Sequence, residues 1–286
     1  MMTSFIPHFP ETAASGRKSA GALRPLSPGI RRALSTVLLT LALSVLGILL
    51  PAGAAPVQAM HNGKTVIVLD PGHGGSDIGA NYAPYVEKAM TLCTAIYLYQ
   101  ELSQYDNVEV YLTRTEDKDV SLAERVDFAH SVNADFLLSL HFNAVGTGEV
   151  KSGSMILPSA FGSLHSQECS YGLLNLQQLS AIGLKSHGFW TRLGRTGADY
   201  FGIIRRSTNY NMPAVITEHC FLDNENDRKF LAQPDSYQKL AHADATALAQ
   251  YLQLQSAALG VNYSGYARPV VQTPPAGVPV LINPIP

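Results

Sequence analysis

The stretch from Val66 to Asp77, VIVLDPGHGGSD, constrains this chain more than any other feature. Its first four residues are apolar and mostly β-branched, and a run of this length predicts a buried strand. Pro71 ends that strand because it has no N–H to donate to a neighbour. The glycines at 72, 74 and 75 then permit a tight, left-handed turn around one imidazole. We expect His73 on a rigid turn at the carboxyl end of a central strand, where open α/β sheets bind ligands.

Strands and helices alternate along the chain, which favours an α/β fold: a single domain with a mostly parallel central sheet flanked by helices on both faces. Strands are predicted at 64–69, 108–113, 136–140, 200–204 and 214–217, and helices at 174–184, at 235–254 and after Glu87 and Ser121. The first helix is expected to bury Leu92, Ile96, Tyr99 and Leu102. A Ser121–Glu124 capping box begins the next helix, which is expected to bury Leu122, Val126, Ala129 and Val132. The glycine-containing stretch 144–170 is expected to be a loop.

The N-terminal 59 residues have the layout of an export segment. Arg31 and Arg32 precede an uncharged apolar run, 33–50, and small residues follow Pro51. The run is also long enough to span a bilayer, which takes roughly 17–25 residues. We therefore expect residues 1–59 to be a polar tail plus either a signal peptide or a membrane anchor. Both alternatives place the rest of the chain outside the cytoplasmic membrane, as a secreted or membrane-anchored protein.

Charge and cysteine content exclude two classes of function. Residues 1–59 carry five Lys and Arg against one acid, which leaves 15 basic and 21 acidic side chains in the remainder. A body that acidic lacks the electrostatic footprint of a nucleic-acid-binding protein. The three cysteines, at 93, 169 and 220, lack metal-ligand spacing, which excludes a zinc site built from cysteines. They allow at most one disulfide and are expected to be buried thiols. The catalytic domain is predicted at 60–256, and the proline-rich residues 257–286 are expected to form a loosely packed tail.

Four polar side chains stand at the ends of predicted elements. His73, His141 and Glu218 follow buried strands, and Glu87 begins a helix. Two imidazoles and one carboxylate are a typical ligand set for catalytic zinc, and a second carboxylate can then act as general base. Each residue alone has an ordinary explanation, since a histidine at a strand end is usually hydrogen-bonded and a glutamate at a helix start favours the macrodipole. Together they indicate a metal hydrolase.

Five ordered motifs resemble those of the zinc-dependent N-acetylmuramoyl-L-alanine amidases, the type-3 amidases of bacterial cell walls. The resemblance covers about residues 64–253. The motifs are Leu69–Ala80, Glu87–Lys88, Leu112–Arg125, Ser139–Ala144 and Pro213–Asn224. The sequence departs from many relatives near Cys220, and the stretch 144–212 is longer than in compact members. We expect these departures to affect substrate preference and regulation rather than metal binding.

The resemblance implies a reaction and a role for each residue. Zinc would be bound by His73, Glu87 and His141, and Glu218 would be the catalytic glutamate. The substrate would be peptidoglycan, cleaved at the amide between the lactyl group of N-acetylmuramic acid and L-alanine of the stem peptide. Two alternatives stay open: a non-catalytic peptidoglycan-binding or regulatory module, and a different zinc peptidase that acts on stem peptides.

Other side chains have weaker assignments. Arg114 and Asp117 are expected to pair with each other or to support the site, and Asp77 to form a turn through its own backbone. His219 alternates away from Glu218 and is expected to be structural. An aromatic and basic set is a candidate for a glycan–peptide groove, with core packing the competing explanation for its tryptophan: Trp190, Tyr200, Arg205 and Arg206.

Overall fold

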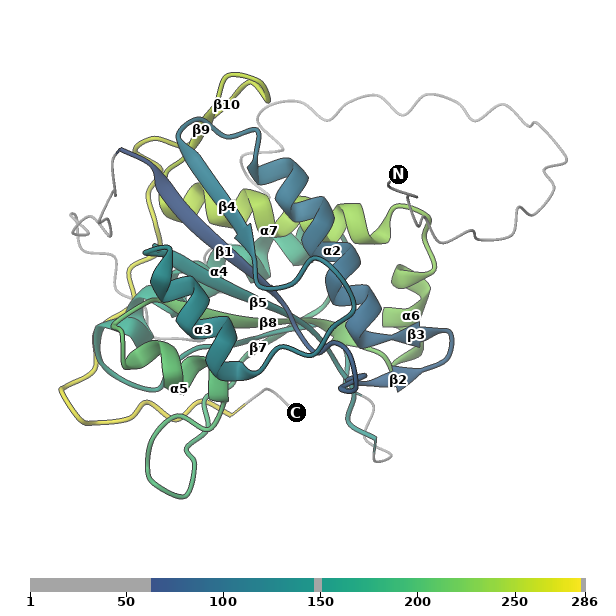
Figure 1. The fold of residues 1–286 in the computed structure, drawn as a ribbon, viewed down its shortest axis with the longest axis horizontal. Coiled ribbons are helices and arrows are strands. Elements are labelled where there is room, and N and C mark those ends of the chain that lie inside the picture. Colours follow the sequence, from purple (N-terminus) through teal and green to yellow (C-terminus); the bar gives the residue numbers. More distant parts are fainter. Residues whose placement is uncertain (1–62, 147–150, 284–286) are drawn as a thin grey trace, which may run out of the picture. The chain divides into compact units, whose positions relative to one another are not determined.

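Six strands form the central sheet of the structure, a computed structural model that describes residues 63–146 and 151–283 (Figure 1). Their order across the sheet is β4-β1-β5-β8-β6-β7. The first four of these strands run parallel, whereas β6 is antiparallel to β8 and parallel to β7. The bounds are β1 Thr65–Pro71, β4 Val108–Leu112, β5 Phe136–Asn143, β6 Ser154–Leu157, β7 Ser186–Phe189 and β8 Ala214–Phe221.

Helices cover both faces of this sheet because successive residues of each strand point to opposite sides. Ile67 and Leu69 of β1 join the core beneath one group of helices, and Val68 joins the core beneath another. The first group is α2 (Glu87–Leu102), α4 (Gly162–Ala181) and α7 (Ser236–Leu252); the second is α3 (Leu122–Ser131) and α5 (Gly202–Thr208). The predicted fold class is confirmed, with a mixed sheet in which parallel pairs predominate.

Two element assignments were wrong. The stretch 144–170 contains β6 and the first half of α4, although its glycines predicted a loop. Residues 200–204 predicted a strand, but α5 begins at Gly202 and buries Ile203 and Ile204 in the core that it shares with α3. Short apolar runs do not distinguish strand from helix, because their residue types suit both kinds of buried segment. The helix α6, Glu225–Leu231, was not predicted.

The predicted buried faces of α2 and α3 were partly wrong. In α2, Ile96 and Tyr99 are each 40% exposed, whereas Thr91 and Thr94 are buried. The threonine hydroxyls tolerate burial because they donate to backbone oxygens, that of Thr91 to Gly72 at 2.8 Å. The capping box of α3 is present, and Val126 and Ala129 are buried as predicted. Leu122, in contrast, is 46% exposed.

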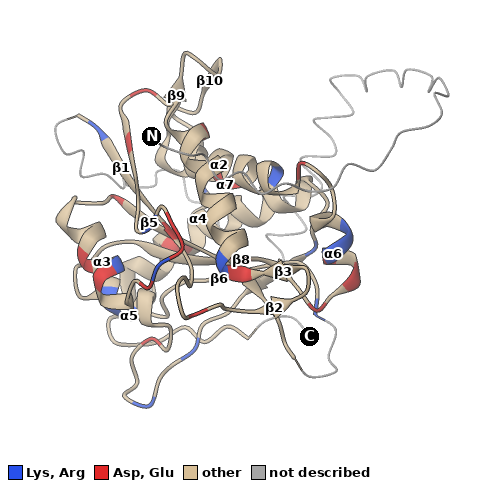
Figure 2. Ribbon diagram, turned by 45° about the vertical axis from the view of Figure 1, so that its right-hand side comes forward, with Lys and Arg blue, Asp and Glu red and all other residues tan. Residues whose placement is uncertain are grey.

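Three smaller features complete the fold. β2 (Asn81–Tyr82) and β3 (Tyr85–Val86) pair between β1 and α2, and β9 (Gln255–Ser256) pairs with β10 (Val261–Asn262) after α7. All three cysteines are free; Cys169 and Cys220 are buried as predicted, and Cys93 is half-buried. Charges of both signs share α3 and α6, as Figure 2 shows, and an ion pair joins Glu225 to Lys229 along α6 at 2.7 Å.

Hydrogen bonds join the proline-rich segment to the rest of the described chain, although most of its residues stay exposed or half-buried. The Thr191 hydroxyl donates to the backbone oxygen of Val280 at 2.7 Å and accepts from the backbone N–H of Ile282 at 2.7 Å. The N–H of Val280 donates to Ala160 at 2.8 Å. Residues between the prolines therefore supply the donors that proline lacks.

No helix within residues 63–146 and 151–283 is long and apolar enough to cross a membrane. The predicted signal or anchor at 33–50, like the rest of residues 1–59, lies outside the described residues.

Candidate metal centre

The candidate residues gather where three neighbouring central strands approach their carboxyl ends. His73 lies on the turn two residues after β1. His141 and Glu218 lie inside β5 and β8, where they are direct partners in the parallel register. Both strands continue beyond these residues, to Asn143 and Phe221, so the prediction that each strand ends at its polar residue was slightly off. Register places the two side chains on the same face of the sheet.

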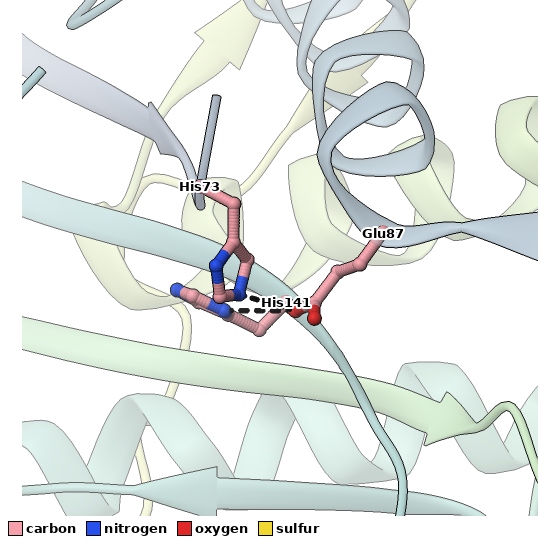
Figure 3. A group of neighbouring side chains, drawn as sticks. All are labelled: His73, Glu87 and His141. Carbon is pink, nitrogen blue, oxygen red and sulfur yellow. Dashed lines mark hydrogen bonds and ion pairs between the residues drawn. The ribbon is translucent and has the colours of Figure 1, made fainter. Parts of the chain in front are cut away.

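His73, Glu87 and His141 converge, as Figure 3 shows. Nε2 of His73 and Nδ1 of His141 each lie 3.0 Å from the same Glu87 oxygen, Oε1. The imidazole rings meet edge to face, with centroids 4.9 Å apart and planes at 79°. One ligand atom from each residue lies within 4.8 Å of the other two. Three side chains from a turn, a helix start and a strand thus meet at one point.

Glycines make room for this convergence. A Cβ at Gly72 would lie 2.3 Å from Cε1 of His141, and one at Gly79 would lie 2.5 Å from Oε2 of Glu87. His73 itself has φ 61°, and Gly74 and Gly75 have φ 129° and 59°. The left-handed turn is confirmed at these positions. Gly72, however, is required for space rather than for a positive φ.

The charges of the three residues are strongly linked. Burial raises the pKa of Glu87, but hydrogen bonds from His141 and His73 outweigh it and hold that pKa well below its usual range. Burial lowers the pKa of His141, but the hydrogen bond and charge of Glu87 raise it to about 9. Glu87 also accepts the N–H groups of Phe142 at 2.9 Å and Ala80 at 2.7 Å. Glu87 is therefore a fixed anion between two imidazoles.

Glu218 differs from its neighbours because one of its oxygens has no partner. Among the described residues, nothing makes a hydrogen bond to Oε2, although that atom is buried. Burial raises the pKa of Glu218 to about 7, and the nearby charge of His141 acts in the opposite direction. A buried polar atom without a partner costs stability, so its presence beside three converging candidate ligands indicates a functional role.

Two buried arginines donate hydrogen bonds to the backbone of the turn that carries His73. Arg125 donates to Asp70 Oδ1 and to the backbone oxygen of His73, both at 2.7 Å. Arg114 donates to the backbone oxygens of Gly72 at 2.8 Å and Lys88 at 2.7 Å, so it supports the site as expected. Asp117 pairs with Lys88 at 2.7 Å rather than with Arg114. Sequence reasoning missed Arg125, for which its place in the third motif was the available signal.

Asp77 and His219 contact the ring or the backbone of the two candidate-ligand histidines. Asp77 lies 2.9 Å from Nδ1 of His73 and also accepts the N–H of Gly79, so it forms the predicted turn and orients a ring as well. Nδ1 of His219 lies 3.1 Å from the backbone oxygen of His141, and its Nε2 lies 2.8 Å from Asp244. His219 is structural as expected, but it is also linked to β5 beside the site.

The candidate groove residues are not part of this centre. Trp190 follows β7, which runs opposite to β8. It therefore lies at the end of the sheet opposite the carboxyl ends of β1, β5 and β8. Tyr200 packs against Phe201 there, and Arg205 donates to the backbone oxygens of Asp199 and Tyr200 at 2.8 and 2.7 Å. Residues 190–206 therefore do not line the site.

Comparison with known proteins identifies the family. Residues 67–250 match the family model described as N-acetylmuramoyl-L-alanine amidase, Amidase_3. The chain belongs to this family. N-acetylmuramoyl-L-alanine amidase CwlM of Bacillus licheniformis is 34% identical over 190 residues, covering 66% of this chain and 69% of that protein. The sporulation-specific N-acetylmuramoyl-L-alanine amidase of Bacillus subtilis (strain 168) is 33% identical with the same coverage.

Solved structures agree with the sequence comparison. The catalytic domain of CwlV, an N-acetylmuramoyl-L-alanine amidase of Bacillus (Paenibacillus) polymyxa var. colistinus, superposes with a TM-score of 0.56 at 28% identity, over 67% of this chain and 99% of that one. AmiC2 of Nostoc punctiforme gives 0.56 at 30% identity, over 67% and 98%. The chain is thus an amidase of peptidoglycan, and the enzyme is favoured over the alternative of a non-catalytic module.

Proposed function

We propose that this amidase is a zinc enzyme in which His73, Glu87 and His141 bind the metal and Glu218 is the general base. The reaction is hydrolysis of the amide between the lactyl group of N-acetylmuramic acid and L-alanine. The observation that carries the proposal is the meeting of three potential ligands at one point, beside a buried carboxylate oxygen that has no partner.

The donor set and its spacing fit zinc. Two imidazole nitrogens and one carboxylate oxygen are a recurring catalytic set, with bonds of about 2.0–2.2 Å. Tetrahedral bonds of that length place ligand atoms about 3.4 Å apart, close to the 3.0 Å that separates Glu87 from each imidazole nitrogen. Two nitrogens directed at one carboxylate oxygen are the arrangement expected of ligands that share a cation. A bound zinc ion supplies Lewis acidity that polarises the scissile carbonyl and makes water acidic enough to react near neutral pH.

Glu218 supplies the proton transfers. Its free Oε2 accepts a proton from the attacking water, and the same carboxyl group then donates that proton to the leaving nitrogen of L-alanine. A pKa of about 7 suits both steps, because a general base works best when its pKa lies near the operating pH. Nothing has to be displaced from Oε2, since no described residue makes a hydrogen bond to it.

Neighbouring residues keep the ligands oriented. Asp77 accepts from Nδ1 of His73, which leaves Nε2 directed at Glu87 and fixes the tautomer. Arg125 anchors the backbone of His73 to the buried Asp70. A site held in this way keeps its ligands in place before substrate binds, which is a requirement for efficient catalysis.

We also propose that the enzyme acts outside the cytoplasmic membrane, because its substrate is the cell wall. The apolar run at 33–50 supports either a cleaved signal peptide or an anchor. The boundaries 1–59, 60–256 and 257–286 remain our proposal for the domain organisation; the family match at 67–250 lies within the central range. The intact mass of exported protein distinguishes the cleaved form from the anchored form.

The mechanism is tested with purified cell wall. We expect Glu218→Gln to keep wild-type zinc content and lose at least 100-fold in rate, because general-base catalysis contributes typically 10²–10⁴-fold. Glu225→Gln is the matched control, since Glu225 is exposed and pairs with Lys229 away from the site. Equal release by wild type and Glu218→Gln would refute the role of Glu218. Mass analysis of the products excludes a stem-peptide peptidase if free lactyl groups and intact L-alanine amino termini appear.

A further inference from the structure

A hollow lies on the face of the sheet that is covered by α2, α4 and α7. It has a volume of about 590 Å³ and is lined by the second half of α2, by α4 and α7, and by the segment around β10. Glu87 begins α2, and Glu101, which lines the hollow, is fourteen residues further along that helix. At 1.5 Å per residue the two are separated by about 20 Å. In Figure 1 the β9–β10 hairpin lies at the end of α2 opposite the β2–β3 pair. The hollow is therefore separate from the metal centre.

Aromatic rings and amides dominate its lining. Tyr97 and Tyr263 are half-buried, whereas Gln100 of α2 and Gln104, just after that helix, are exposed. Within the described residues, the hydroxyls of Tyr97 and Tyr263 and the side-chain amide of Gln100 make no hydrogen bond, so their donors and acceptors are available to a ligand. Pockets with aromatic walls and a few polar groups are typical of small-molecule and sugar sites, because rings cover the apolar faces of a ligand.

The charges of the lining favour a neutral ligand. Glu101 is paired with His242 at 2.7 Å. Of the described residues that line the hollow, none is Lys or Arg. A stem peptide carries carboxylates and would require a cation, whereas the N-acetylated amino sugars of a glycan strand present hydroxyls, amides and apolar ring faces. The lining therefore suits the glycan part of the substrate rather than its peptide part.

One wall of the hollow comes from outside the family match. That match ends at residue 250, whereas Leu259, Val261 and Tyr263 follow it. Backbone hydrogen bonds hold this wall in place: the N–H of Asp106 donates to the backbone oxygen of Gln255 at 2.8 Å, and that of Tyr263 donates to the backbone oxygen of Leu254 at 2.8 Å. The hollow is thus preformed, which reduces the entropy cost of binding.

We propose that this hollow binds the N-acetylated glycan strand of peptidoglycan, as a second contact of the enzyme with the polymer that it cuts. The identity of the polymer rests on the proposed function, but the chemistry of the hollow does not. Occupation of two sites on one polymer raises apparent affinity for the wall without changing affinity for a small soluble fragment. The hollow consequently affects hydrolysis of intact wall and leaves hydrolysis of single muropeptides unchanged.

Binding is measured on the full chain with a peptide-free probe, the tetramer of N-acetylglucosamine, by calorimetry. We expect saturable binding by wild type and at least tenfold weaker binding by the double variant Tyr97→Ala/Tyr263→Ala. Tyr99→Ala is the matched control, because Tyr99 lies on the same helix, is 40% exposed and does not line the hollow. If the double variant is poorly folded, Gln100→Arg introduces bulk and charge at an exposed position and serves in its place.

Activity assays complete the test. The double variant should hydrolyse insoluble wall about tenfold more slowly than wild type and Tyr99→Ala, and cleave a soluble muropeptide at the wild-type rate. Absence of tetramer binding by wild type, or unchanged binding by the hollow variants, would overturn the proposal. Glu218→Gln separates the two proposals: it should bind the tetramer normally, so failure of the catalytic mechanism leaves the glycan site intact, and the reverse also holds.

Discussion

Replacement of Gly72 by alanine tests the geometry of the proposed metal centre most directly. Gly72 does not have a positive φ, so alanine meets no backbone strain there, and the effect comes entirely from the added methyl group. That carbon would lie 2.3 Å from Cε1 and 2.5 Å from Nε2 of His141, where ordinary contacts begin at 3.4 Å. The imidazole, or the turn that faces it, has to move by about 1 Å.

A shift of this size predicts a specific loss. Misplacement by about 1 Å costs roughly 100-fold in rate, and overpacking lowers the free energy of unfolding by about 1–3 kcal/mol. We expect Gly72→Ala to show about 100-fold lower kcat/KM on purified wall and weaker zinc binding in competition with a chelating dye. Urea unfolding monitored by circular dichroism measures the change in stability separately.

Gly194→Ala is the control for this substitution. Gly194 also lacks a positive φ, and a Cβ there would have its nearest neighbour at an ordinary 3.6 Å, the backbone oxygen of Ala198. We expect its zinc affinity and kcat/KM to equal those of wild type. If Gly72→Ala also binds zinc and turns over like wild type, then the close packing of the His73 turn against His141 does not position the ligands, and the reasoning fails.

Three further predictions concern stability. Burial raises the pKa of Asp70, but the charge of Arg125 and two hydroxyl donors hold that pKa below its usual 3.8. The ion pair between Asp70 and Arg125 therefore stabilises the fold above about pH 4, and this stabilisation is lost on acidification. Asp70→Asn should cost about 3–5 kcal/mol at pH 7 in urea unfolding, and an undiminished cost at pH 3 would contradict this assignment. Ser121→Ala should cost about 1 kcal/mol, because it removes the cap on the N–H of Glu124; a loss of zinc affinity in that variant would be unexpected. Removal of metal with a chelator should lower the thermal midpoint reversibly, and a midpoint indifferent to zinc would argue against the site.

The convergence of the candidate metal ligands was largely predictable because these residues lie at chemically distinctive positions. A β-branched run that ends in Pro and Gly marks the turn that carries His73, and a Ser–Glu capping box marks the start of α3. The approach of His73 and His141 follows from the topological rule that parallel strands share a carboxyl edge, and Glu87 joins them from the start of α2. Patterns of this kind are local, so they can be recognised in the sequence without knowledge of the rest of the fold.

The parts that were missed depend on distant contacts. Thr91 lies on the buried face of α2 because its hydroxyl reaches the backbone of Gly72, and no periodicity of apolar residues reports such a bond. Ile203 and Ile204 suit a strand by residue type, but packing against α3 makes them helical. The requirement for glycine at position 72 comes from the imidazole of His141, which is 69 positions away in the sequence but packs against Gly72 in the fold. Tertiary contacts decided each of these cases.

The adjacency of β1, β5 and β8 at the centre of the sheet has a consequence for partly folded molecules. No contiguous segment carries the whole candidate site, since His73 lies on the turn after β1 whereas His141 and Glu218 lie in β5 and β8, and these strands meet only when the sheet forms around β5. On the proposed assignment, hydrolysis therefore requires all three strands to be paired. We expect a partly folded chain in which one of these strands is unpaired to lack hydrolytic activity.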